Sequence, residues 1–128
     1  MAEPEQILST IDAYAKTFTA HDRDGWLALW CEDATQEDPV GAPVNTGPEA
    51  IGLFWDNTHA LGDLRLEATD EPIVVGDEAL AFFRVDIGHG ADRLSAPRIV
   101  DHMHFADDGR IQSLRAFWDP ATLGPSPE

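Results

Sequence analysis

The stretch "APRIVDHMHFADDGRIQSLRAFW", residues 96–118, predicts two long antiparallel strands joined by a tight turn. Residues 96–105 and 110–118 are rich in β-branched, aromatic and aliphatic side chains, and the Asp-Asp-Gly between them is a typical hairpin turn. Three earlier runs have the same character: "LRLEATD" (64–70), "PIVV" (72–75) and "ALAFFRVDIG" (79–88). The second half of the chain is therefore expected to form an antiparallel meander.

The first half of the chain is predicted to be mainly helical. Apolar residues at spacings of four, three and four indicate an amphipathic helix over 5–20, formed around Ile7, Ile11, Tyr14 and Phe18. Residues 26–30 predict a short second helix, and residues 34–38 a short strand that ends before Pro39. A third helix is expected between Pro48 and Gly62.

Helices followed by long antiparallel strands indicate an α+β fold. Such a sheet can curl around the first helix and leave a hollow at one end, so the pattern predicts a cone with an apolar pocket. The 128 residues predict a single domain over 1–128, in which the Pro-rich residues 121–128 form a flexible tail.

The composition narrows the possible partners. A net charge of −16, from 24 acidic against 8 basic residues, argues against nucleic acid and against anionic membrane surfaces. No apolar run approaches the roughly 20 residues of a membrane span, and the N-terminus lacks the pattern of a signal peptide. The single cysteine, Cys31, excludes an internal disulfide and a cysteine-based metal site. These features favour a cytoplasmic protein.

One carboxyl group stands in an apolar row. Strand alternation places Asp101 on the same face as Ile99, Met103 and Phe105. A buried carboxylate there is costly, so its pKa is expected to rise until the group is neutral. The alternative is a register that turns the neighbouring histidines, His102 and His104, inward and Asp101 toward solvent.

Two more polar groups are candidates for the same hollow. Tyr14 lies on the apolar stripe of the first helix, where it packs in the core or directs its hydroxyl into the hollow. Asp38 ends a strand before a proline, either as a turn residue or as a carboxylate at the pocket mouth. Together with Asp101 they suggest two neutral donors for an enolate oxygen and one ionised carboxylate that moves a proton.

The residues "ATQEDPVG" (34–41), "IDAYAKTFTAHD" (11–22) and "RIVDHMHF" (98–105) together resemble bacterial ketosteroid isomerases over about residues 5–120. The resemblance implies the nuclear-transport-factor-2-like fold, in which a curved antiparallel sheet forms a cone around three helices, and a homodimer. It implies isomerisation of 3-oxo-Δ5-steroids to their Δ4 isomers without a cofactor or a metal. Ketosteroid isomerases are themselves the standard example of a carboxylic acid kept protonated in an apolar site.

The resemblance also implies roles for individual residues. Asp38 corresponds to the base, and Tyr14 and protonated Asp101 to the donors that hold the dienolate oxygen. The residues expected to line the steroid site are Trp118, Leu114 and Ala116, with Phe54, Trp55, Phe83 and Met103 as further candidates. Some members of the family have tyrosines that hydrogen-bond to the catalytic one, whereas this chain has Trp30 and Trp55 at the matching positions. An indole N–H cannot accept a hydrogen bond, so a chain of tyrosines is not expected here.

Other functions remain open at this stage. The same kind of cone hosts hydrolases, dehydratases, polyketide cyclases and non-catalytic binding modules for apolar ligands. A hydrolase would need a water-activating group such as an arginine or histidine in the pocket, and Arg65, Arg84, Arg98 and Arg115 are not expected to point inward. His102 and His104 could offer two ligands to a metal, but no third ligand is evident nearby, so an outward or dimer-facing pair is favoured.

Overall fold

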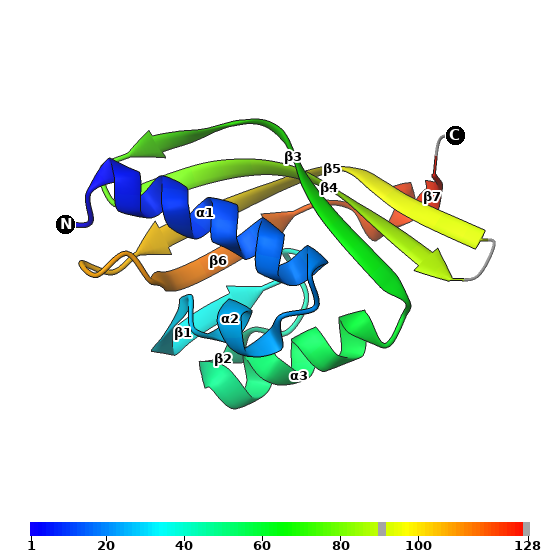
Figure 1. Ribbon diagram of the computed structural model, residues 1–128, viewed down its shortest axis with the longest axis horizontal. Helices are drawn as coiled ribbons and strands as arrows, with labels where there is room; N and C mark the ends of the chain where they lie inside the picture. The colour runs from blue at the N-terminus through cyan, green and yellow to red at the C-terminus, as the bar shows by residue number, and fades with distance from the viewer. Residues whose placement is uncertain (90–91, 127–128) are drawn as a thin grey trace.

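The computed structural model describes residues 1–89 and 92–126. Within these ranges the elements in chain order are α1 (Pro4–Thr19), α2 (Arg23–Leu27), β1 (Trp30–Glu37), β2 (Asn45–Thr46), α3 (Gly47–His59), β3 (Asp63–Val75), β4 (Glu78–His89), β5 (Asp92–Phe105), β6 (Ile111–Phe117), a 3-10 turn (Pro120–Thr122) and β7 (Gly124–Pro125). The α+β class is confirmed, and Figure 1 shows the three helices gathered on one side of a curved sheet.

The described strands form one seven-stranded sheet in the order β2-β1-β6-β5-β4-β3, with β7 paired to β5. The predicted meander is present from β3 to β6, where every neighbouring pair is antiparallel. The prediction of a wholly antiparallel sheet is wrong at one place, because β1 runs parallel to β6. The parallel pair arises where the helical first half of the chain joins the edge of the meander.

Several element boundaries differ from the predicted ones. The second helix begins earlier, at Arg23, because the carboxylate of Asp22 caps it by accepting the Gly25 N–H at 3.0 Å. It ends before Trp30, whose backbone pairs with Ile111 and so belongs to β1. The runs 64–70 and 72–75 are parts of one long strand, β3, with register irregularities between them.

The inner face of the sheet is packed against α1 and α3. Helix α1 starts with a capping box between Glu3 and Gln6 and lies against β3, and α3 packs on β1. The face predicted for β5 is confirmed, since Ile99, Asp101, Met103 and Phe105 are all buried. His102 and His104 point outward and pair with Glu78 and Asp77 at 2.8 and 3.1 Å. The alternative register is therefore wrong.

The C-terminal segment folds back on the sheet. Gly124 and Pro125 pair with Ser95 and Leu94 of β5, and the Ser126 hydroxyl lies 3.2 Å from an Asp86 carboxylate oxygen. This part of the predicted flexible tail thus makes regular contacts through residue 126, and residues 127–128 lie outside the described ranges. These contacts carry Leu123 back over the inner side of the sheet, where it packs against the core.

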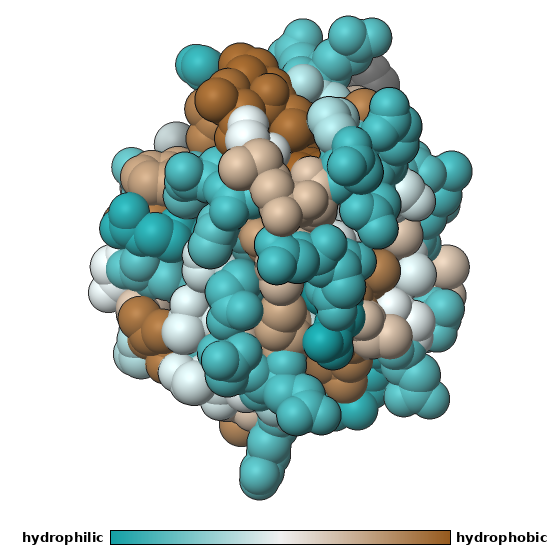
Figure 2. All heavy atoms as spheres, turned by 90° about the vertical axis from the view of Figure 1, so that its left-hand side faces the viewer, coloured by the Kyte–Doolittle hydropathy of each residue, from teal (hydrophilic) through white to brown (hydrophobic). Residues whose placement is uncertain are grey.

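Figure 2 shows one end of the molecule, which is mostly hydrophilic, with a hydrophobic area at the top where β3 ends in Figure 1. Ile73 and Val75, at the end of β3, are 52% and 72% exposed. Among the described residues, no helix combines the length and apolar character that a membrane crossing requires.

The packing of α1 predicts a large difference between two adjacent residues. Ile7 is completely buried and Leu8 is 44% exposed. Ile7→Ala should lower the free energy of unfolding by about 2–5 kcal/mol, because it leaves a cavity in the core. Leu8→Ala, as the control, should change it by no more than about 0.5 kcal/mol. Urea denaturation of both variants tests this, and equal effects would contradict the orientation of α1.

Candidate active site

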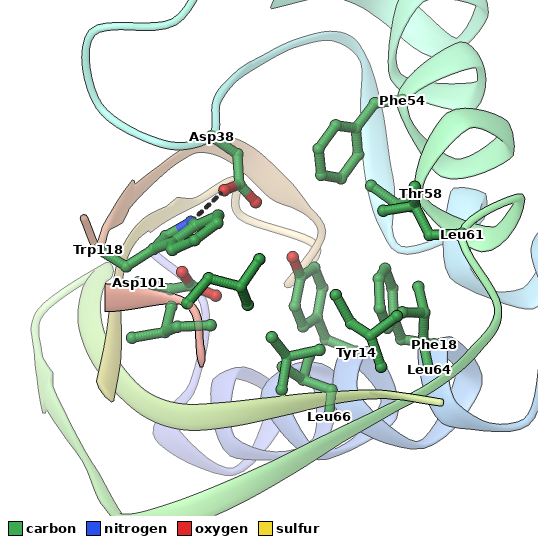
Figure 3. Close-up of a pocket in the computed structure, with 14 residues that line it drawn as sticks. Tyr14, Phe18, Asp38, Phe54, Thr58, Leu61, Leu64, Leu66, Asp101 and Trp118 are labelled. Atoms are coloured by element: carbon green, nitrogen blue, oxygen red, sulfur yellow. Dashed lines mark hydrogen bonds between the residues drawn. The ribbon is translucent and has the colours of Figure 1, made fainter. Parts of the chain in front are cut away.

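A cavity of about 180 Å³ opens between α1, α3 and the inner face of the sheet. Tyr14, Asp38 and Asp101 all line it, so the structure brings together the three residues singled out in the sequence (Figure 3). Apart from these three and Thr58, the residues found to line it are Phe18, Phe54, Leu61, Leu64, Leu66, Val85, Ile87, Ile99, Trp118 and Leu123. The cavity thus combines an apolar wall with a small set of polar groups, as ligand sites usually do.

Asp101 lies in the middle of the inner face of β5. Its partners on the neighbouring strands are Ala81 of β4 and Ala116 of β6, both almost completely buried. Because alanine side chains are short, they leave the carboxyl group space toward the cavity. Asp101 is 3% exposed, and its Oδ1 has no hydrogen-bonding partner among the described residues.

Burial determines the charge state of Asp101. Desolvation, followed by repulsion from Asp38, raises the pKa of the Asp101 carboxyl well above its ordinary value. A protonated carboxyl group has an O–H that can donate to a ligand oxygen. The raised pKa therefore favours the protonated form of Asp101, which can donate a hydrogen bond to a ligand in the cavity.

Asp38 lies directly after β1, where Pro39 follows and the backbone N–H of Val40 donates to the Ala116 carbonyl at 2.8 Å. The indole Nε1–H of Trp118 donates to Asp38 Oδ1, also at 2.8 Å (Figure 3). Burial raises the pKa of Asp38, and this hydrogen bond opposes the rise. The two aspartates therefore differ: Asp38 has a donor that stabilises its anion, and Asp101 Oδ1 has none.

Tyr14 supplies a hydroxyl group from α1. Its ring is held by aromatic neighbours, with ring centroids 5.7 Å from Trp26, 6.3 Å from Trp30 and 6.0 Å from Phe83. Burial, with smaller contributions from Asp101 and Asp38, raises the pKa of Tyr14 well above its ordinary value, so the phenol keeps its proton. Tyr14 is the second neutral donor in the cavity.

Trp30 and Trp55, which occupy the positions of the additional tyrosines found in some ketosteroid isomerases, pack differently around Tyr14. Trp30 contacts the Tyr14 ring, but its Nε1 has no hydrogen-bonding partner among the described residues. Trp55 packs one layer further away, against Phe18 and Trp26. Tyr14 is thus positioned by aromatic packing, and Trp26, which sequence reasoning did not single out, has the shortest ring contact with it.

The residues predicted to bind substrate divide into two groups. Phe54 and Trp118 line the cavity. The others are absent from its wall and form the core beside it: Leu114, Ala116, Trp55, Phe83 and Met103. Strand alternation identifies the inner face correctly, but the cavity occupies only one end of that face. Met103 and Leu114 are paired nearer the other end, next to Phe105 and Ile111.

The wall contains residues that the sequence reasoning missed. Thr58 of α3 and Leu61, two residues beyond the end of α3, follow the predicted Phe54 at spacings of four and three, as residues on one face of a helix do. On β4, Val85 and Ile87 alternate in the way expected of an inner face. Those patterns are visible in the sequence, but only the curvature of the sheet decides which part of each pattern meets the cavity.

Comparisons with known proteins place this chain in a family. Residues 11–114 match the model of the SnoaL-like domain. A curated Steroid Delta-isomerase from Nocardioides simplex is 38% identical over 100 residues, which cover 78% of this chain and 79% of that protein.

Solved structures share the fold of this chain. RV0760c from Mycobacterium tuberculosis superposes with a TM-score of 0.86 at 24% identity, covering 98% of this chain and 100% of that one. A structure of RV0760c in complex with estradiol-17β-hemisuccinate has a TM-score of 0.82 at 25% identity, with 93% and 98% coverage. The epoxide hydrolase/cyclase-like enzyme SalBIII, described in pyran ring formation in salinomycin, has a TM-score of 0.88 at 20% identity, with 98% and 100% coverage.

The fold and the cavity are those of a small α+β enzyme domain with a largely apolar pocket. The chain belongs to the SnoaL-like family, and its similarity to a curated isomerase over most of its length identifies it as an isomerase.

The raised pKa of Asp101 predicts how stability depends on pH. The folded protein binds this proton more tightly than the unfolded chain does, so the free energy of unfolding falls as pH rises from the ordinary carboxyl range toward the raised pKa. The slope approaches about 1.4 kcal/mol per pH unit for one proton. Asp101→Asn should remove this part of the slope and leave the part that comes from Asp38.

Urea denaturation between pH 4 and pH 8 measures the slope. Asp70→Asn, at an exposed position of β3, is the control and should keep the wild-type slope. The same variants can be examined by infrared spectroscopy, where the band of a neutral carboxylic acid should be lost in Asp101→Asn alone. An unchanged slope together with an unchanged band would show that Asp101 is ionised.

Proposed function

We propose that this isomerase converts 3-oxo-Δ5-steroids into 3-oxo-Δ4-steroids without a cofactor. The observation that carries the proposal is the difference between two carboxyl groups in one apolar cavity: Asp38 accepts a hydrogen bond that stabilises its anion, and Asp101 is buried with its Oδ1 unpartnered among the described residues, which raises its pKa. This is the pairing of one base with one acid that proton transfer next to a carbonyl group requires.

The reaction is an intramolecular proton transfer in two steps. The Asp38 carboxylate removes a proton from carbon 4, the electron pair moves into the ring, and a dienolate forms with its negative charge on the 3-oxygen. The Tyr14 and Asp101 O–H groups donate to that oxygen. Asp38 then returns the proton to carbon 6, which leaves the double bond between carbons 4 and 5. Each well-placed donor is typically worth about 100- to 1,000-fold in rate.

The ligand class is supported by the cavity wall and by the relatives. Aliphatic and aromatic side chains from α3, β3 and β4 face a cavity whose polar groups are concentrated at Tyr14, Asp38 and Asp101 (Figure 3). The curated relative is named a Steroid Delta-isomerase, and RV0760c has been crystallised with a steroid ester. A polycyclic ketone with a single oxygen at the donor end fits this distribution.

A hydrolase or cyclase is the alternative. SalBIII shares the fold, but at 20% identity it is evidence for the fold alone. In the described part of the chain, no arginine or histidine lines the cavity to activate a water molecule. The isomerase is therefore the better supported of the two.

We further propose a homodimer and a cytoplasmic location for this single domain. On the outer face of the sheet, Phe82, Val100 and Phe117 form a row across three paired strands, and Phe117 is 45% exposed. An apolar row of this kind is suited to pairing with a second copy. The net charge of −16 supports high solubility.

Removing the base tests the reaction directly. Asp38→Asn should lower the rate of 5-androstene-3,17-dione isomerisation by about 100- to 10,000-fold, because the amide cannot accept the proton. Glu37→Gln is a matched control. The carboxylate of this neighbouring residue accepts a hydrogen bond from Arg115 at 2.8 Å, and Glu37 does not line the cavity. The rate is followed by the ultraviolet absorbance of the conjugated product.

Binding should survive in the same variant. Equilenin, a phenolic steroid whose phenolate resembles the dienolate, should still bind Asp38→Asn, because Tyr14 and Asp101 are unchanged. Near-wild-type turnover in Asp38→Asn would reject Asp38 as the base.

The Trp118–Asp38 hydrogen bond predicts a change in the pH profile. The bond lowers the pKa of Asp38, so Trp118→Phe should raise that pKa. Because the base must be ionised, the acidic limb of the pH profile of kcat/KM should move to higher pH in Trp118→Phe. The activity that this variant loses at low pH should return as the pH rises. Phe54→Leu, which alters the wall but removes no hydrogen bond to Asp38, should leave the limb in place. A limb unmoved in Trp118→Phe would show that the indole does not affect the base.

A further inference from the structure

Thr58 is a polar residue in the apolar part of the cavity wall. Among the described lining residues outside the proposed catalytic set, it is the one with a hydroxyl group. It projects from α3 between Phe54 and Leu61, on the side of the cavity opposite Asp101 and Trp118 (Figure 3). A ligand held at the donor end by Tyr14 and Asp101 therefore meets Thr58 with a different part of its ring system.

The hydrogen-bonding capacity of Thr58 is already partly used. Its Oγ1 donates to the Trp55 carbonyl at 3.0 Å, which is a common bond for a threonine within a helix. His59 Nδ1 lies 3.0 Å from the same carbonyl oxygen and 3.5 Å from Thr58 Oγ1. A hydroxyl group has a single hydrogen, so with that hydrogen directed at Trp55 the Thr58 oxygen has only lone pairs to offer a ligand.

With only lone pairs to offer, the Thr58 oxygen favours the binding of a ligand that has a hydroxyl group there over one that has a ketone. A hydroxyl on the facing ring edge can donate to Thr58 and replace a bond that it made to water. A ketone at the same carbon brings two acceptors together, and it loses its bond to water without gaining another. The neighbouring Phe54 and Leu61 side chains have no donor to compensate.

We propose that Thr58 selects steroids that carry a hydroxyl group, rather than a ketone, on the ring edge facing α3. This inference rests on the proposed function, because Tyr14 and Asp101 must first hold the 3-oxygen of the ligand. It specifies the substrate class: a 3-oxo-Δ5-steroid with a second, alcoholic oxygen. The preference for the hydroxyl over the ketone is expected to be about tenfold in Kd, the size of one net hydrogen bond.

Steroid phenols test the inference separately from turnover. The phenol oxygen is placed by Tyr14 and Asp101, and matched compounds carry a hydroxyl, a ketone or hydrogen at carbon 7, 11, 16 or 17. Dissociation constants are measured by calorimetry for the wild type, Thr58→Val and Thr58→Ser. Valine keeps the shape and removes the oxygen, and serine keeps an oxygen that can make the same bond to Trp55.

The expected result is that, at one or more of these carbons, the hydroxyl compound binds the wild type about tenfold more tightly than the ketone. Thr58→Val should abolish that ratio, and Thr58→Ser should retain it. Equal affinities at every carbon, a preference for the ketone, or a ratio unchanged in Thr58→Val would overturn the role of Thr58 while leaving the proposed isomerase intact. Failure of all the phenols, including those with hydrogen, to bind would overturn the proposed function and this inference with it.

Discussion

The proposed chemistry depends on a buried carboxyl group, that of Asp101, whose Oδ1 has no hydrogen-bonding partner among the described residues. Asp101 lies in the inner row of β5 with Ala81 and Ala116 on either side, and its Oδ1 makes no hydrogen bond within the described residues. Such a group is stable in an apolar environment only when it is protonated. The nearby Asp38 reinforces this state by repulsion, while Trp118 favours the anion of Asp38. Burial of Asp101 and the indole N–H at Asp38 thus act in the same direction, and together they favour the proton on Asp101 and the anion on Asp38.

The scaffold explains why this arrangement persists although it does not help folding. The free energy lost by burying Asp101 is offset by the packing around it, in which Ile7, Trp26 and Phe83 are almost completely buried. The same packing holds Tyr14 through ring contacts instead of a hydrogen-bonded tyrosine chain. The Tyr14 hydroxyl is then directed by sterics, so its hydrogen remains available to a ligand. Stability and the donor pair depend on the same aromatic cluster.

The fold and the polar groups could be predicted because they follow from local periodicity. The spacing along α1 places Tyr14 inward, and alternation along β5 does the same for Asp101. The parallel pairing of β1 with β6 and the extent of the cavity depend on how the sheet curves, which no local pattern records. For that reason Leu114 and Met103 were assigned to the right face but to the wrong end of it, and Leu123, from the C-terminal segment, was not found. The bond from Trp118 to Asp38 joins residues 80 positions apart and has no local signature.

The elements that carry the proposed catalytic residues differ from those that form most of the apolar wall of the ligand site. Tyr14, Asp38 and Asp101 come from α1, the end of β1 and β5, whereas much of the apolar wall comes from α3, β3 and β4. Residues on α3 can therefore change without altering the pair of carboxyl groups, and the pair can change without altering the wall. This separation gives a physical reason why proteins that share this fold at 20–25% identity can be described with different chemistries and ligands. In the proposed mechanism the electrostatic difference between Asp38 and Asp101 sets the type of reaction, and the side chains of α3, Thr58 among them, set which ligand is held next to them.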